Sequence, residues 1–230
     1  MKIAAVSDID FPGSMEMFWS ALQKTKQPDL LLFAGDMCDF GHYSQYKVVL
    51  DKIKKKGWKC PIYACFGNKE FEQDYAKIKE IARGVTFIED EKVEFEIKGK
   101  SIGIVGSKGV LDMPTWWQAQ NVMGIKDTYK MRRALMVKLM NELKSDIKIL
   151  LTHYAPTYRT LKGEDASIWK VLGTNKLEKY MVKAGISFAI HGHAHFGTHL
   201  AFVGKIPVFN VALPISKQIT MIDTEKLPKA

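Results

Sequence analysis

Short apolar runs alternate with longer amphipathic segments along most of this chain, and this alternation limits the folds that are open to it. The runs predict buried strands at residues 3–6, 30–34, 62–66, 147–151 and 188–190. Helices are predicted to begin near Ser14, His42, Phe71, Tyr129 and Thr174, between those strands. A repeated strand–helix–strand order is typical of an α/β protein.

Other segments have a different pattern. Residues 92–105 predict two strands about a turn at Gly99, and the tail from Ile206 is also rich in strand formers. Antiparallel strands of this kind favour a mixed sheet, or two sheets, over a purely parallel one. Residues 107–127 and 154–173 read as long loops, which are often functional. The first loop holds two adjacent tryptophans, Trp116 and Trp117, and we predict that at least one packs in the core.

Composition limits the class of protein. The 230 residues suit one α/β domain spanning positions 1–230, and 47% of them are hydrophobic. No apolar stretch approaches the ~20 residues of a membrane span, and the N-terminus lacks a secretion pattern, so we expect a soluble cytoplasmic protein without a membrane partner. Cys38, Cys60 and Cys65 lack the spacing of a zinc finger or redox pair, which predicts reduced, packed thiols.

The net charge is +9, which suits a phosphate-bearing partner. The densest basic run is DKIKKKGWKC, at residues 51–60. We interpret it as the solvated face of a helix that ends at Gly57. The alternative is a nucleic-acid surface on which Trp58 stacks against a base.

Polar residues follow each of the five predicted strands. In chain order they are Asp8 and Asp10, Gly35 and Asp36, Gly67 and Asn68, His153, and the run HGHAH with His193 and His195. Ligands of an open α/β sheet bind beyond the carboxyl ends of its strands, so five chain segments deliver oxygen and imidazole donors to one region. Taken singly, these residues are typical of turns or of structural histidines. Together they predict a metal site, with His193 and His195 on the same side of an extended segment.

Five ordered blocks carry a resemblance to a known family. They are Asp8 in SDID, GDMCD at 35–39, GNKE at 67–70, THYAP at 152–156 and GHAH at 192–195. In this order they resemble the calcineurin-like metallophosphoesterase superfamily, whose blocks run Asp-x-His, Gly-Asp-x-x-Asp, Gly-Asn-His-Glu/Asp, an isolated His and Gly-His-x-His. The match covers nearly the whole chain and is specific for the superfamily, but it does not define the substrate.

The resemblance implies an α/β fold of two mixed β-sheets packed as a sandwich and flanked by helices. It also implies two divalent metals that hold a hydroxide for attack on phosphorus. The first metal would be held by Asp8, Asp10 and His195, and the second by Asn68, His153 and His193. Asp36 would bridge the two metals. Asp39 would act next to these ligands without binding a metal itself. Manganese or iron(II) is expected, with zinc and magnesium as alternatives.

Two positions depart from the family pattern. Asp10 stands where the family has a metal-binding histidine, and Lys69 stands where it has a histidine that contacts substrate. An aspartate at position 10 makes the site one charge unit less positive, and a protonated lysine at position 69 would restore that unit. We therefore predict that the two residues compensate each other, with Lys69 and Asp39 as catalytic residues.

These observations leave three hypotheses for function. The first is a phosphoesterase, a hydrolase acting on a small soluble phosphodiester or phosphomonoester. The second is a nuclease on single-stranded nucleic acid, whose binding would weaken steeply with salt. The third is a non-catalytic scaffold with an eroded metal site and a protein partner that the sequence leaves unidentified.

Overall fold

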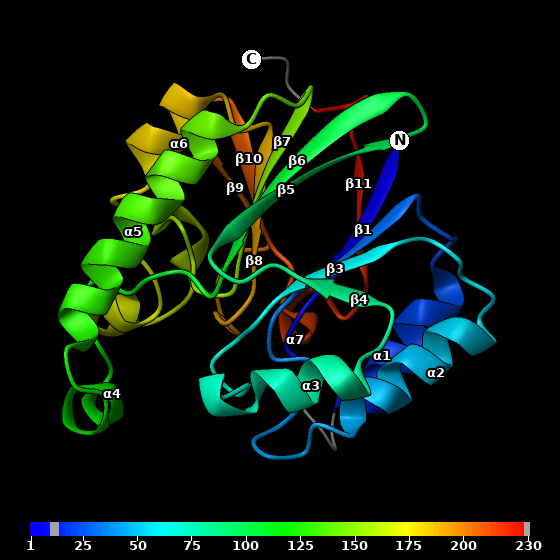
Figure 1. Cartoon of the computed structure of the whole chain (residues 1–230), viewed down its shortest axis with the longest axis horizontal. Helices are drawn as coiled ribbons and strands as arrows, with labels where there is room; N and C mark the ends of the chain where they lie inside the picture. Colours follow the sequence, from blue (N-terminus) through cyan, green and yellow to red (C-terminus); the bar gives the residue numbers. More distant parts are fainter. Residues whose placement is uncertain (10–13, 228–230) are drawn as a thin grey trace.

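The computed structural model describes residues 1–9 and 14–227, and in this part of the chain two β-sheets pack face to face between layers of helices (Figure 1). The first sheet has five strands in the order β11 (Thr220–Asp223), β1 (Lys2–Val6), β2 (Leu30–Ala34), β3 (Ile62–Cys65) and β4 (Val85–Phe87). β1 to β4 are parallel and β11 is antiparallel.

The second sheet has six strands among the described residues. Their order is β5 (Glu91–Ile97), β6 (Lys100–Ser107), β7 (Ile147–Thr152), β8 (Phe188–His191), β10 (Ile206–Asn210) and β9 (Leu200–Val203). The inner pairs are parallel, and β5 and β9 add antiparallel edges. The fold predicted from the sequence, two mixed sheets flanked by helices, is therefore confirmed.

Helices cover the outer face of each sheet. α1 (Ser14–Lys24), α2 (Gln45–Lys55) and α3 (Tyr75–Ile81) pack on the first sheet, and α5 (Ile125–Glu142) and α6 (Glu178–Ala184) pack on the second (Figure 1). Shorter elements lie in the connections: α4 (Trp116–Asn121), α7 (Leu213–Ser216), and the 3₁₀ turns η1 (Glu72–Asp74), η2 (Arg159–Leu161) and η3 (Ala166–Val171).

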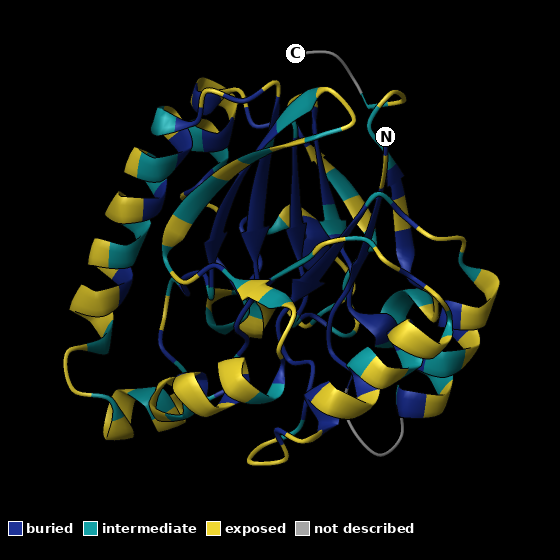
Figure 2. Cartoon of the chain, turned by 45° about the vertical axis from the view of Figure 1, so that its right-hand side comes forward, coloured by how far each residue is buried: buried dark blue, intermediate teal, exposed yellow. Residues whose placement is uncertain are grey.

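Both faces of the central strands are buried, which explains their continuous apolar runs. Along β1, Ile3 and Ala5 point into the core between the sheets, while Ala4 and Val6 point toward the helices of the first sheet. Figure 2 shows the central strands as a buried interior, with the exposed residues on the helices, the connections and the outer strands. A strand of this kind has no solvent face, so its sequence shows no alternation.

Some sequence predictions differ from the structure. α5 begins at Ile125 rather than Tyr129, and the predicted loop at 107–127 contains α4, which Thr115 and Gln118 start with a reciprocal capping box. The prediction that Trp116 or Trp117 packs in the core is wrong, because these side chains are 76% and 53% exposed. The helix that carries them lies at the end of α5, away from the sheets (Figure 1).

The basic run at 51–60 behaves as the helical interpretation predicted. α2 ends at Lys55, and Gly57 takes a left-handed φ of 85°. Trp58 is buried in the core of the first sheet, so it cannot stack on a nucleic acid. Cys38 and Cys65 are buried, and all three cysteines are free thiols. Among the described residues, no helix is both long and apolar enough to span a bilayer.

Candidate metal centre

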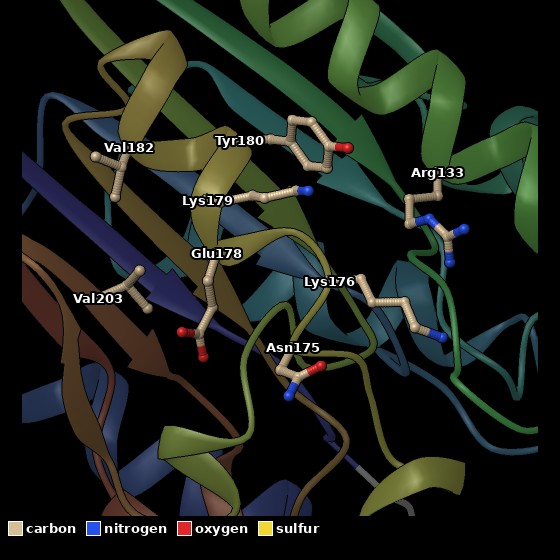
Figure 3. Close-up of a pocket in the computed structure, with 8 residues that line it drawn as sticks. All are labelled: Arg133, Asn175, Lys176, Glu178, Lys179, Tyr180, Val182 and Val203. Carbon is tan, nitrogen blue, oxygen red and sulfur yellow. The ribbon is translucent and has the colours of Figure 1, made fainter.

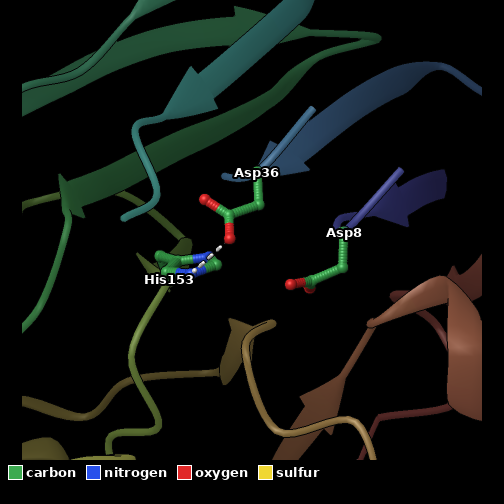
Figure 4. A group of neighbouring side chains, drawn as sticks. All are labelled: Asp8, Asp36 and His153. Atoms are coloured by element: carbon green, nitrogen blue, oxygen red, sulfur yellow. Dashed lines mark ion pairs between the residues drawn. The ribbon is translucent and has the colours of Figure 1, made fainter. Parts of the chain in front are cut away.

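Acidic and histidine side chains from both sheets meet where the parallel strands end. Asp8 follows β1, Asp36 follows β2 and His153 follows β7. All three residues are buried, and one potential ligand atom from each lies within 4.8 Å of the others. Figure 4 shows the three side chains pointing toward one another from separate strand ends. The edge of the sandwich therefore carries a compact group of side chains that could bind a metal ion.

Three residues of this region have a left-handed backbone. The φ angles are 57° at Asp8, 50° at Asp36 and 68° at His193. Such values are uncommon outside glycine and cost roughly 1 kcal/mol each. Backbone strain of this kind concentrates at functional sites, where the surrounding structure holds it in place. The positive φ at His193 also shows that the segment holding His193 and His195 is not extended there, so that prediction was wrong.

Asp8 is held from three directions. Its Oδ2 accepts hydrogen bonds from the Ser7 hydroxyl at 2.6 Å and from the His193 N–H at 3.0 Å, while Oδ1 lies 3.0 Å from His195 Nε2. Burial alone would raise the pKa of Asp8, but the bond with His195 and the nearby His153 outweigh it, so the pKa is lowered. Asp8 is thus kept as a carboxylate, the form that binds cations.

His153 faces two oxygen acceptors. Its Nδ1 lies 2.9 Å from the Ala34 carbonyl oxygen and so donates to it. Its Nε2 points at Asn68 Oδ1, 2.8 Å away, and at Asp36 Oδ2, 3.4 Å away. Burial opposes a charge on His153, but the carboxylate of Asp36 outweighs this effect and raises the pKa to about 9. Because Nδ1 already donates to Ala34, these two acceptors face a proton on Nε2, and a bound metal can take the place of that proton.

The ring of His193 packs at an angle against the rings of His153 and Tyr154. Its ring centre lies 4.9 Å from that of His153 and 4.8 Å from that of Tyr154. Burial, with His153 adding to it, lowers the pKa of His193 to about 3. The imidazole is therefore neutral, as a metal ligand must be.

Glu70 is a residue whose role the sequence did not reveal. It is fully buried, and its carboxylate accepts hydrogen bonds from the N–H groups of Asp36 at 3.0 Å, Met37 at 2.9 Å and Gly67. The Tyr46 hydroxyl donates a fourth at 2.8 Å. Glu70 therefore ties the loop after β2 to the loop after β3. The GNKE block contains it, but a glutamate after a turn usually reads as exposed.

Lys69 and Asp39 form an ion pair at the mouth of the cluster. Lys69 Nζ lies 3.3 Å from Asp39 Oδ1, with their side chains 19% and 33% exposed. Burial would raise the pKa of Asp39, but the Phe40 N–H and Lys69 lower it. The backbone N–H of Lys69 donates to Asp36 Oδ1 at 2.8 Å. Lys69 is thus anchored beside the residue predicted to bridge two metals.

The structure brings six of the seven predicted ligands into this one cluster. They are Asp8, Asp36, Asn68, His153, His193 and His195. The seventh, Asp10, lies outside the described residues. The donor set of carboxylate oxygens, an amide oxygen and imidazole nitrogens fits manganese, iron(II) or zinc.

A pocket of about 560 Å³ lies beside α6 (Figure 3). None of the residues that line it is a predicted metal ligand. Arg133, Lys176 and Lys179 give it a basic character. Two of its charged residues have partners: Lys176 pairs with Asp112, and Glu178 accepts hydrogen bonds from Thr157 and Arg159. The group of potential metal ligands found among the described residues lies instead at the strand ends, so that cluster is the candidate site.

The described residues thus form a four-layer α/β sandwich with a candidate metal-binding site at its strand ends. The chain belongs to the calcineurin-like phosphoesterase family, whose model matches residues 1–197. The resemblance seen in the five sequence blocks is thereby confirmed. A comparison with curated proteins finds no significant match.

Solved structures share the fold at low sequence identity. The phosphopantetheinyl hydrolase PptH from Mycobacterium tuberculosis is 15% identical with a TM-score of 0.70, covering 99% of this chain and 98% of its own. A putative 5′-nucleotidase from Staphylococcus aureus is 16% identical with a TM-score of 0.53, covering 91% of this chain and 48% of its own. These likenesses support the fold alone.

Proposed function

We propose that this protein is a dinuclear metal phosphoesterase that hydrolyses a small phosphodiester or phosphomonoester. Asp8 and His195 would hold one divalent cation, with Asp10 as a further predicted ligand. Asn68, His153 and His193 would hold the other, and Asp36 would lie between them. The observation that carries the proposal is the buried meeting of Asp8, Asp36 and His153 within 4.8 Å.

Bound divalent cations would neutralise charge on the phosphoryl oxygens and lower the pKa of a nucleophilic water. The chain supplies the other groups. Lys69 would donate a hydrogen bond to a phosphoryl or leaving oxygen, and Asp39 positions it through their 3.3 Å ion pair. Asp36 Oδ1 is fixed by the Lys69 N–H, so the same short segment orients both the carboxylate and the ammonium.

Two observations favour a small phosphoester as the substrate. The two similar structures are named a phosphopantetheinyl hydrolase and a putative 5′-nucleotidase, and these names favour a small phosphoester. The buried position of Trp58 removes the stacking residue of the alternative in which the basic run at 51–60 binds nucleic acid. A small phosphorylated molecule is therefore the partner that we propose, and a cytoplasmic location remains a prediction from the sequence.

Metal content tests the proposal directly. Protein incubated with manganese and then desalted is expected to retain about two metals per chain by elemental analysis. Asp36→Asn should lose most of this metal, because the amide keeps the shape of the side chain and tolerates a left-handed backbone but removes the charge. Circular dichroism should show the same fold for both proteins. Little retained metal in the parent protein would instead favour the non-catalytic scaffold.

Lys69→Ala tests the role of the ammonium. Loss of the hydrogen bond should slow an alkyl phosphodiester roughly tenfold or more beyond its effect on a nitrophenyl diester, because a good leaving group needs little help. The measurement is kcat/KM for both esters with the parent and variant proteins. The lysine, with its ordinarily high pKa, is a weak proton donor, so the role expected is a hydrogen bond. Equal losses on both esters would rule out a leaving-group role.

A further inference from the structure

An aromatic pocket opens directly beside the candidate metal centre. It has a volume of about 350 Å³, within the range of small-molecule sites. Asn68 and His193, two of the predicted metal ligands, line one part of it, and the remaining lining is dominated by Phe40, Phe71 and Trp117. A phosphoester held at the metals would therefore have its organic part within reach of this pocket.

The aromatic side chains offer exposed ring surface rather than a closed core. Phe40 and Phe71 stack with ring centres 5.5 Å apart and an interplanar angle of 27°. Phe40 is 49% exposed and Trp117 is 53% exposed, although both rings are large and apolar. Exposed aromatic rings beside a catalytic cluster are costly in water unless a ligand covers them.

The polar groups around Trp117 are used to hold α4 in place. Gln118 Oε1 accepts hydrogen bonds from the Thr115 N–H and from the Tyr129 hydroxyl, both at 3.0 Å. Gln118 Nε2 donates to the Tyr154 hydroxyl at 3.2 Å. These bonds fix the helix that carries Trp117 and leave little capacity for reading polar edges of a ligand. Recognition in the pocket would rest on ring stacking.

We infer that this pocket binds a planar aromatic group of the substrate, so that the enzyme selects phosphoesters of nucleosides or of aryl alcohols over those of small alkyl alcohols. The inference rests on the proposed function for the position of the phosphate. Stacking on Trp117 should tighten binding roughly tenfold over a ligand without a ring, the lower part of the range known for bases on aromatic side chains.

The test follows Trp117 itself. Protein labelled with 5-fluorotryptophan carries five labels, one on each tryptophan. The fluorine NMR signal of Trp117 is identified by its loss in Trp117→Phe. We would titrate phenylphosphonate, which resists hydrolysis, against methylphosphonate, with and without manganese. The expected result is a shift of the Trp117 signal by phenylphosphonate at roughly tenfold lower concentration than methylphosphonate requires. Adenosine 5′-monophosphate against ribose 5-phosphate distinguishes a nucleobase from a simple aryl ring.

A neighbouring residue gives a matched control. Trp116 is 76% exposed and does not line the pocket. By isothermal titration calorimetry, Trp117→Ala should lose the preference for phenylphosphonate over methylphosphonate, and Trp116→Ala should keep it. Equal response of Trp117 to both phosphonates, or no response at millimolar ligand, overturns the pocket assignment even where metal binding and turnover are intact. A ring-dependent shift without metal binding would keep the pocket while the proposed function fails.

Discussion

Glu70→Ala is expected to lower the free energy of unfolding by about 3 kcal/mol or more, because it leaves three buried backbone N–H groups without an acceptor and each such loss costs roughly 1–3 kcal/mol. The substitution also removes the acceptor of the Tyr46 hydroxyl. Because Glu70 is fully buried, bulk water does not replace these hydrogen bonds.

The loss should reach the metal cluster as well. Glu70 ties together the loops after β2 and β3, which carry Asp36 and Asn68. A glycine at position 67 lets these loops approach, since a Cβ there would overlap the Asp36 carboxylate. We therefore expect Glu70→Ala to lose manganese binding together with stability. Denaturant unfolding and elemental analysis on the same preparation measure both effects.

Two further variants make this result interpretable. Glu70→Gln keeps the volume of the side chain and one acceptor oxygen, so its loss of stability should be smaller and the protein should remain folded for measurement. Glu72→Ala removes a nearby carboxylate that is 66% exposed and should change the free energy of unfolding by well under 1 kcal/mol. A Glu70→Ala protein as stable as Glu72→Ala would show that Glu70 does not hold the loops.

The predictions from sequence succeeded where the signal was local. Each candidate ligand lies within a few residues of the end of an apolar run, and the carboxyl ends of parallel strands share one edge of a sheet. That rule accounts for the meeting of Asp8 and Asp36, which follow neighbouring strands of the first sheet, whereas His153 joins them from the second sheet through the packing of the two sheets. The two strands about Gly99 were equally local, because the turn and its flanking strands adjoin in sequence.

Features that depend on tertiary packing were missed. The burial of Glu70 follows from two loops closing over it, and no neighbouring residue in the chain signals this. The exposure of Trp116 and Trp117 depends on α4 lying away from the sheets, so an aromatic pair that suggested core instead lines or flanks a pocket. The capping box of Thr115 and Gln118 was the one local signal for α4.

The sequence pattern HGHAH also did not indicate the left-handed backbone at His193. Alternate residues share a face only in an extended segment, and a φ of 68° breaks that geometry. His193 and His195 nevertheless reach the same cluster, one beside His153 and the other against Asp8. The pattern thus identified the residues correctly but assigned the wrong local conformation to them.

His153→Ala is expected to lower kcat/KM on a nitrophenyl phosphodiester by a factor on the order of 10³. The Nε2 atom of His153 faces both Asn68 Oδ1 and Asp36 Oδ2. Its removal takes away a predicted metal ligand and leaves both oxygens without their shared partner. Because the ring also donates to the Ala34 carbonyl, the end of β2 loses a contact that positions Asp36.

The comparison that isolates this effect uses another histidine. His199 hydrogen bonds to the Asn210 carbonyl and contributes to no part of the cluster, so His199→Ala should retain turnover within a few fold of the parent. His153→Ala should also bind less manganese, and excess manganese should restore only part of the rate if the imidazole both holds a cation and orders Asp36. Turnover within tenfold of the parent, with metal content unchanged, would remove His153 from the proposed site and leave its contacts with Ala34 and Asn68 as structural ones.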